Sequence, residues 1–149
     1  MNIHMETMPE IAVIYLRRTG PYGGDNRGLM ERMKAWATGN GLLETGIILS
    51  IAWDDPAQTP PERCRYDVCL ASDRRFPEPD AGMSLGKLPG GRYACFQGSH
   101  TPEGVQALWQ DSFSALPELG FCPDPARPVM ERYCPERLAQ GLCELCIPV

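Results

Sequence analysis

The sequence lacks the long apolar runs and targeting segments that mark membrane and exported proteins. No stretch of the 149 residues approaches the ~20 consecutive apolar residues of a membrane helix. The N-terminus, MNIHMETMPE, has no basic flank followed by an apolar stretch, so it shows no secretory signal. These absences predict a cytoplasmic protein that has no membrane partner.

Motifs for nucleotides and nucleic acids are missing as well. The chain has no glycine-rich phosphate-binding motif and no ribbon of basic and aromatic residues. Its formal net charge is −5, from 14 basic and 19 acidic side chains, whereas nucleic-acid-binding domains usually carry a basic patch. We therefore expect no direct nucleic-acid partner, and the acidic balance leaves room for cationic ligands.

Histidine is scarce, and the cysteines do not suggest a disulfide framework. His4 and His100 have no acid or nucleophile partner in the nearby sequence, so we assign neither a catalytic role. The seven cysteines, an odd number without an export signal, are expected to be reduced and mostly buried. In the C-x-x-C of Cys143 and Cys146, strand alternation would turn the two thiols to opposite faces. We expect no disulfide, no zinc or other cofactor, and no catalytic residue set.

The residues that are present describe two similar halves. Alternating or β-branched runs predict strands, and apolar residues at helical spacing after Asn26 and Thr101 predict helices. The predicted strands are 11–17, 46–53 and 64–70 in the first half and 90–96, 129–134 and 142–149 in the second. We place the halves at about 1–72 and 83–149, joined by a charged, proline-rich linker at about 73–82.

The repeated strand, helix, strand, strand order predicts the fold class. We expect an α+β fold of two fused β-α-β-β modules related by a pseudo-twofold axis. The strands would form one antiparallel sheet with both helices on one side. A groove between two such modules is a natural place for a small-molecule site.

Two adjacent aspartates, Asp54 and Asp55, could be read as a metal or acid–base pair. However, no histidine lies near them in the sequence, and a hard metal ion would need several more oxygen ligands. Three prolines follow within six residues, and aspartate and proline are typical turn residues. We interpret the pair as part of a turn that connects two strands of a hairpin.

Four segments, YLRRTGPYG, WDDPAQTPPERCRYDVCL, LPGGRYACF and VMERY, resemble the GyrI-like small-molecule-binding family. This family includes the DNA gyrase inhibitor protein and the effector-binding domains of AraC-type and multidrug-responsive transcription activators. The resemblance implies one domain over residues 1–149, with a ligand cleft between the modules and a cleft acid that pairs with cationic, often lipophilic, ligands. The matching acid is Glu131 of VMERY. No helix-turn-helix segment flanks the domain, so the implied macromolecular partners are a separate DNA-binding protein or DNA gyrase.

The residues around Glu131 leave two interpretations open. Strand alternation puts Val129, Glu131 and Tyr133 on one face. If that face points inward, Glu131 is a poorly solvated carboxylate that would favour a cationic partner. If it points outward, Glu131 is an ordinary exposed glutamate or pairs with a neighbouring arginine. The resemblance favours the inward orientation.

Aromatic side chains complete the predicted site. An aromatic ring face can hold a lipophilic cation, although each aromatic residue taken alone is more often part of the core. The candidates are Trp53, Tyr66, Tyr93, Trp109 and Tyr133.

These residues predict a protein that binds small, cationic, amphipathic molecules. One alternative is a hydrolase of reactive small molecules, in which Glu131 and Tyr133 or Tyr93 activate water. Another is a DNA gyrase inhibitor that acts by protein contact.

Overall fold

An antiparallel sheet of eight strands and two long helices make up the computed structural model, which describes residues 2–149. The strands are β1 (Asn2–Met8), β2 (Ile11–Thr19), β3 (Ile47–Ala52), β4 (Arg65–Ala71), β5 (Met83–Leu88), β6 (Gly91–Ser99), β7 (Met130–Tyr133) and β8 (Leu142–Pro148). The helices are α1 (Asn26–Gly39), α2 (Pro102–Glu118), a short α3 (Pro135–Leu138) and a 3-10 turn, η1 (Pro61–Arg63). The predicted α+β class is confirmed. None of the helices within residues 2–149 is long and apolar enough to cross a membrane.

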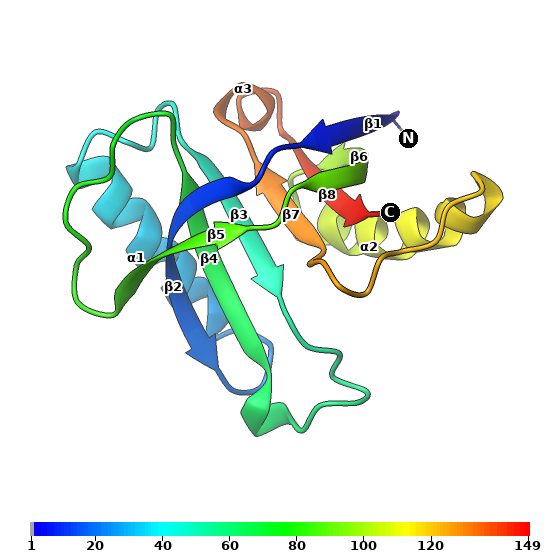
Figure 1. The fold of residues 1–149 in the computed structure, drawn as a ribbon, viewed down its shortest axis with the longest axis horizontal. Helices are drawn as coiled ribbons and strands as arrows, with labels where there is room; N and C mark the ends of the chain where they lie inside the picture. Colours follow the sequence, from blue (N-terminus) through cyan, green and yellow to red (C-terminus); the bar gives the residue numbers. More distant parts are fainter. Residues whose placement is uncertain (1) are drawn as a thin grey trace.

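The two halves are related by the predicted pseudo-twofold symmetry. The strand order is β1-β6-β8-β7-β3-β4-β2-β5, and every pair is antiparallel. Replacing each strand by its counterpart in the other half reverses this order onto itself. The halves meet where β3 pairs with β7, with Ser50 opposite Glu131 (Figure 1). The sheet is therefore continuous across the pseudo-axis.

The outer strand of each half comes from the other half. β1 pairs with β6, and β5 pairs with β2 (Figure 1). The sequence analysis missed both strands, because β1 (NIHMETM) is largely polar and exposed, and β5 (MSLGKL) is short and contains Gly86. Residues 72–82 form no helix or strand, as expected of a linker. The division at this linker nevertheless does not separate two self-contained units.

Both long helices cover the same face of the sheet, as predicted. Met33 and Ala37 of α1 pack on β2 and β4, while Leu108 and Leu116 of α2 pack on β6 and β8. A third apolar cluster lies on the opposite face; its buried members include Val13, Leu49, Ile51, Cys69, Tyr93, Cys95, Met130 and Cys146. The two faces of the sheet therefore carry different sets of side chains.

Asp54 and Asp55 fix the connection between β3 and β4. The Asp54 carboxylate accepts hydrogen bonds from the backbone N–H of Arg65 (2.8 Å) and from Nε and Nη2 of its guanidinium (3.0 and 2.9 Å). These side-chain hydrogen bonds lower the pKa of Asp54. Asp55 accepts from the N–H of Ala57 at 2.9 Å, as turn aspartates do. The interpretation of the pair as a turn is confirmed.

Candidate functional site

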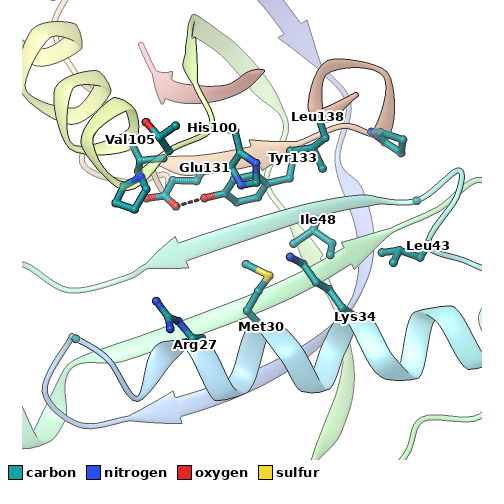
Figure 2. Close-up of a pocket in the computed structure, with 15 residues that line it drawn as sticks. Arg27, Met30, Lys34, Leu43, Ile48, His100, Val105, Glu131, Tyr133 and Leu138 are labelled. Carbon is teal, nitrogen blue, oxygen red and sulfur yellow. Dashed lines mark hydrogen bonds between the residues drawn. The ribbon is translucent and has the colours of Figure 1, made fainter. Parts of the chain in front are cut away.

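A cleft lies on the helix-covered face of the sheet, between α1 and α2, where the halves meet. Its volume is about 970 Å³. Side chains from β3, β7, α1, α3 and the start of α2 line it (Figure 2). Much of the wall is apolar, formed by Met30, Leu43, Ile48, Val105 and Leu138. A cleft of this size and lining can accommodate a drug-sized organic molecule.

Glu131 places a carboxylate in this cleft, and neutral groups alone hold it. It accepts hydrogen bonds from Ser50 Oγ (3.0 Å) and Trp109 Nε1 (2.8 Å). A third comes from the Tyr133 hydroxyl (2.6 Å), as Figure 2 shows. None of the ion pairs found within residues 2–149 includes Glu131. Neutral donors stabilise a charged carboxylate without cancelling its charge. The negative charge of Glu131 therefore remains available to a ligand.

Tyr133 is a donor to Glu131 and also part of the cleft wall. Burial raises the pKa of Tyr133, and the nearby negative charge of Glu131 raises it further. The phenol therefore stays neutral and keeps donating to the carboxylate. The ring of His100 lies on the other side of Tyr133, with 5.4 Å between ring centroids and a tilt of 60°. Together these rings form an aromatic rim beside the acidic group.

The structure brings four of the six predicted site residues to this face. Glu131 and Tyr133 line the cleft directly. Trp109 is not in the lining, but its indole N–H positions the Glu131 carboxylate from α2. Tyr66 packs under α1, where burial raises its pKa. Trp109 therefore holds the Glu131 carboxylate in place, and Tyr66 belongs to the apolar cluster under α1.

The prediction that Trp53 and Tyr93 line the same cleft was wrong. Both side chains pack with the apolar cluster on the opposite face of the sheet. The indole N–H of Trp53 donates to Asp67 at 2.6 Å, and the fully buried Tyr93 donates its hydroxyl to the Pro89 carbonyl at 3.1 Å. Strand alternation explains the position of Trp53. Ile48 and Ser50, two places apart in β3, point to the cleft side, so Trp53, three places after Ser50, points to the opposite side.

Two basic residues of α1 were missed by the sequence analysis. Arg27 and Lys34 line the cleft and point toward it with Met30 between them (Figure 2). Both are exposed, and neither belongs to an ion pair within residues 2–149. Their i, i+3, i+7 spacing places all three on one helix face, which is the signal that could have identified them. The cleft thus has one acidic group on its floor and two basic groups along one wall.

Tyr133→Phe should reveal the raised pKa of this tyrosine, because the substitution changes how the free energy of unfolding depends on pH. At pH 8 the variant should be less stable by about 1–3 kcal/mol, because Glu131 loses a donor. Above pH 10 the unfolded wild type ionises Tyr133, but the folded protein does not. The stability of the wild type should then fall, relative to the variant, by about 1.4 kcal/mol per pH unit. Urea unfolding of both proteins between pH 8 and 11 measures this difference, and a constant difference would contradict the assignment.

Comparison with known proteins gives full-length matches. A sequence profile described as the GyrI-like small molecule binding domain matches residues 1–149. YosT, from the SPbeta prophage of Bacillus subtilis (strain 168) and named as a transcriptional regulator, is 40% identical; the match covers 100% of this chain and 99% of YosT. A DNA gyrase inhibitor of Edwardsiella piscicida is 32% identical, with 100% and 98% coverage.

Two solved structures share the fold. SAV2435 bound to tetraphenylphosphonium superposes with a TM-score of 0.64 at 15% identity, covering 100% of this chain and 94% of that chain. EcmrR in a complex with DNA superposes with a TM-score of 0.72 at 13% identity. That match covers 99% of this chain but only 56% of the EcmrR chain. At such low identity these structures establish the fold alone.

Proposed function

Because this chain belongs to the GyrI-like small-molecule-binding family, we propose that it binds a lipophilic cation in the cleft, where Glu131 recognises the positive charge. The observation that carries the proposal is the Glu131 carboxylate, which has three neutral donors and no ion pair within residues 2–149. A carboxylate has about four acceptor sites, so one remains for a ligand. We place this binding in the cytoplasm.

The ligand's body would lie against the apolar wall and the aromatic rim. Met30, Ile48 and Val105 offer apolar contact, and a cation near Tyr133 also gains from the electron-rich ring face. The tetraphenylphosphonium bound to SAV2435 is a ligand of this chemical class. Arg27 and Lys34 favour an orientation that keeps the positive centre near Glu131 and away from α1, since like charges at the cleft wall repel. This arrangement favours a single positive centre on a large apolar body.

Glu131→Gln tests the proposal, because it keeps the shape of the side chain and removes its charge. Two of the three donors are hydroxyls, which can rotate to suit the amide. A positive charge about 6 Å from the carboxylate gains roughly 2–3 kcal/mol at an effective dielectric constant of about 20. Tetraphenylphosphonium should therefore bind at least about tenfold more weakly, since ~1.4 kcal/mol is one decade. Neutral triphenylphosphine oxide should change by less than about twofold. Isothermal titration calorimetry of both compounds measures these affinities.

Glu103→Gln is the matched control for this experiment. Glu103 is an exposed acid in the first turn of α2 and does not line the cleft, so its loss should leave both affinities unchanged. Equal losses for the cation and the neutral compound in Glu131→Gln would show that Glu131 does not recognise charge. Recovery of a chemically altered electrophilic compound from wild type, but not from Glu131→Gln, would instead support the hydrolase alternative.

The relative from Edwardsiella piscicida supports a second candidate, in which the chain inhibits DNA gyrase by protein contact. A supercoiling assay separates the two functions. Inhibition that is equal for wild type and Glu131→Gln, and that does not respond to tetraphenylphosphonium, would support protein contact independent of the cleft. Inhibition that changes with the cation would link the two functions.

A further inference from the structure

A row of metal-binding side chains crosses the face of the sheet opposite the cleft. His4 of β1 is the direct cross-strand partner of Cys95 of β6, and Cys95 is the partner of Cys146 of β8. Directly opposed residues of antiparallel strands share a face, with their Cβ atoms about 4.5–5.5 Å apart. Glu6, two residues from His4 on β1, points to the same side. Three strands thus bring together two thiols, one imidazole and one carboxylate.

The donor atoms of this group are already close to one another. His4 Nε2 lies 3.0 Å from Glu6 Oε1, and Cys95 Sγ lies 4.0 Å from the same oxygen. These three donor atoms all lie within 4.8 Å of one another. Cys146 is the direct cross-strand neighbour of Cys95 on the same face of the sheet. Bonds of 2.0–2.3 Å to zinc place tetrahedral ligand atoms roughly 3.3–3.8 Å apart. Small side-chain rotations would bring His4, Glu6 and Cys95 to that geometry, and Cys146 is the adjacent residue that can complete it.

We propose that Cys95, Cys146, His4 and Glu6 form a binding site for a thiolate-seeking metal ion, with Zn²⁺ as the expected occupant. Zinc is coordinated in proteins by cysteine, histidine and carboxylate ligands, usually four of them. Cu⁺ shares the preference for thiolates, but the imidazole and carboxylate make this set better suited to zinc. Binding replaces two thiol protons by two Zn–S bonds, so about two protons leave with each ion bound.

Burial and neighbouring charges fit such a site. Cys95 and Cys146 are fully buried, whereas His4 and Glu6 are 44% and 35% exposed, so an ion could enter past the two surface ligands. Arg132 donates to both oxygens of Glu6, at 2.9 and 3.1 Å, which holds the carboxylate in place. Each oxygen keeps a further lone pair for a metal ion. Such outer contacts to a ligand are typical of metal sites.

This site is independent of the cleft and of the proposed ligand. The proposed site also gives a role to Cys146 of the C-x-x-C, which the ligand site does not use. The alternation predicted for Cys143 and Cys146 is confirmed, because Cys143 packs under α2 while Cys146 lies on the opposite face. The sequence-based expectation of no zinc rested on the C-x-x-C needing two further ligands, for which only His4, His100 and the scattered cysteines were available. The strand register instead pairs Cys146 with a distant cysteine and with a histidine from the start of the chain.

The test uses the full-length, reduced protein after treatment with a chelator and desalting. Zn²⁺ is titrated in competition with a chromogenic chelator, and Co²⁺ reports thiolate coordination by its visible and near-ultraviolet absorption. Wild type should bind one Zn²⁺ per chain. Cys146→Ser and the surface variant His4→Gln should each weaken binding at least about tenfold, the scale of effects seen even for outer contacts. Cys143→Ser is the matched control and should bind like wild type.

The possible outcomes distinguish the proposed zinc site from non-specific metal binding. His4→Gln replaces an exposed side chain, so circular dichroism should show that it folds and its result can be interpreted even if Cys146→Ser is unstable. Binding of Cu⁺ but not Zn²⁺, in a parallel competition assay, would overturn the choice of zinc. Absence of stoichiometric binding of either ion would overturn the site. Equal weakening by Cys143→Ser and Cys146→Ser would do the same.

Discussion

Replacing Arg132 by methionine is expected to lower the free energy of unfolding by about 3 kcal/mol. The Arg132 side chain is only 12% exposed and forms two hydrogen bonds of 3.0 Å to the fully buried Glu144 carboxylate and two more to Glu6. Breaking a buried ion pair costs about 3–5 kcal/mol, because the remaining charge is left without its partner. The lower end applies here, since Arg137 Nε still lies 3.1 Å from Glu144. Urea unfolding at pH 7 measures the loss.

The difference between Arg132→Met and wild type should also depend on pH. The hydrogen bond from Arg132 is the main cause that lowers the pKa of Glu6 below its usual value of about 4.5. A lowered pKa contributes stability above that value, and this contribution is lost as the pH falls through the folded-state pKa. The variant lacks this contribution. Its stability should therefore approach that of wild type as the pH falls below about 4.5.

Two further variants test whether the lost stability comes from the unpaired Glu144 carboxylate or only from the loss of the Arg132 contacts. The double variant of Arg132→Met with Glu144→Leu removes both members of the buried pair and should recover much of the lost stability. Arg65→Met breaks a more exposed pair, in which Arg65 is 45% exposed, and should cost only about 0.2–1 kcal/mol. A double variant as unstable as Arg132→Met would contradict the explanation by an unpaired carboxylate.

Gly104→Ala is expected to destabilise the protein by about 2–3 kcal/mol and to weaken ligand binding in the cleft. A Cβ atom at Gly104 would overlap the carbonyl oxygen of Ser99 and lie 2.8 Å from Ser99 Cβ. Overpacking costs typically about 1–3 kcal/mol, and a rigid backbone neighbour allows little relief. Gly104 also donates its N–H to the capping hydroxyl of Thr101 at 2.9 Å. The first turn of α2, which lines the cleft with Thr101 and Val105, would therefore be pushed away from β6.

Gly28→Ala in α1 is the matched control for this substitution. A Cβ atom at Gly28 meets nothing within 4 Å, so alanine should stabilise the helix by about 0.4–1 kcal/mol. Thermal unfolding, with and without tetraphenylphosphonium, measures both effects. A Gly104→Ala protein with wild-type stability and affinity would show that α2 is not held against β6 at this point.

Regular side-chain periodicity made much of the fold predictable. Six of the eight strands and both long helices follow period-2 or period-3.6 patterns, and Thr101 caps α2 as expected. The edge strands β1 and β5 lack such a pattern, because edge strands are commonly short or carry charged side chains that discourage pairing with other chains. Their positions depend on pairing with the opposite half, which no local pattern encodes.

The candidate site was only partly predictable for a related reason. Alternation identifies which residues of one strand share a face, but it does not say which face the helices cover. Trp53 was therefore assigned to the wrong side of the sheet, although its position after β3 fixes it on the same face as Ile51. Glu131 could be assigned only through the resemblance to a known family. Its donors Ser50 and Trp109 reach it from strand β3 and helix α2, which the chain order alone does not bring together.

The exchange of outer strands has a consequence for how the chain can fold. Asn2 pairs with Gln97, so strand β1 has no partner until residues 91–99 have been made. The first half likewise lacks its outer strand until residues 83–88 appear. Contacts between residues so distant in the chain close large loops and slow the search for the native state. Each half therefore completes its sheet only by pairing with a strand from the other side of the linker, which couples the folding of the two halves.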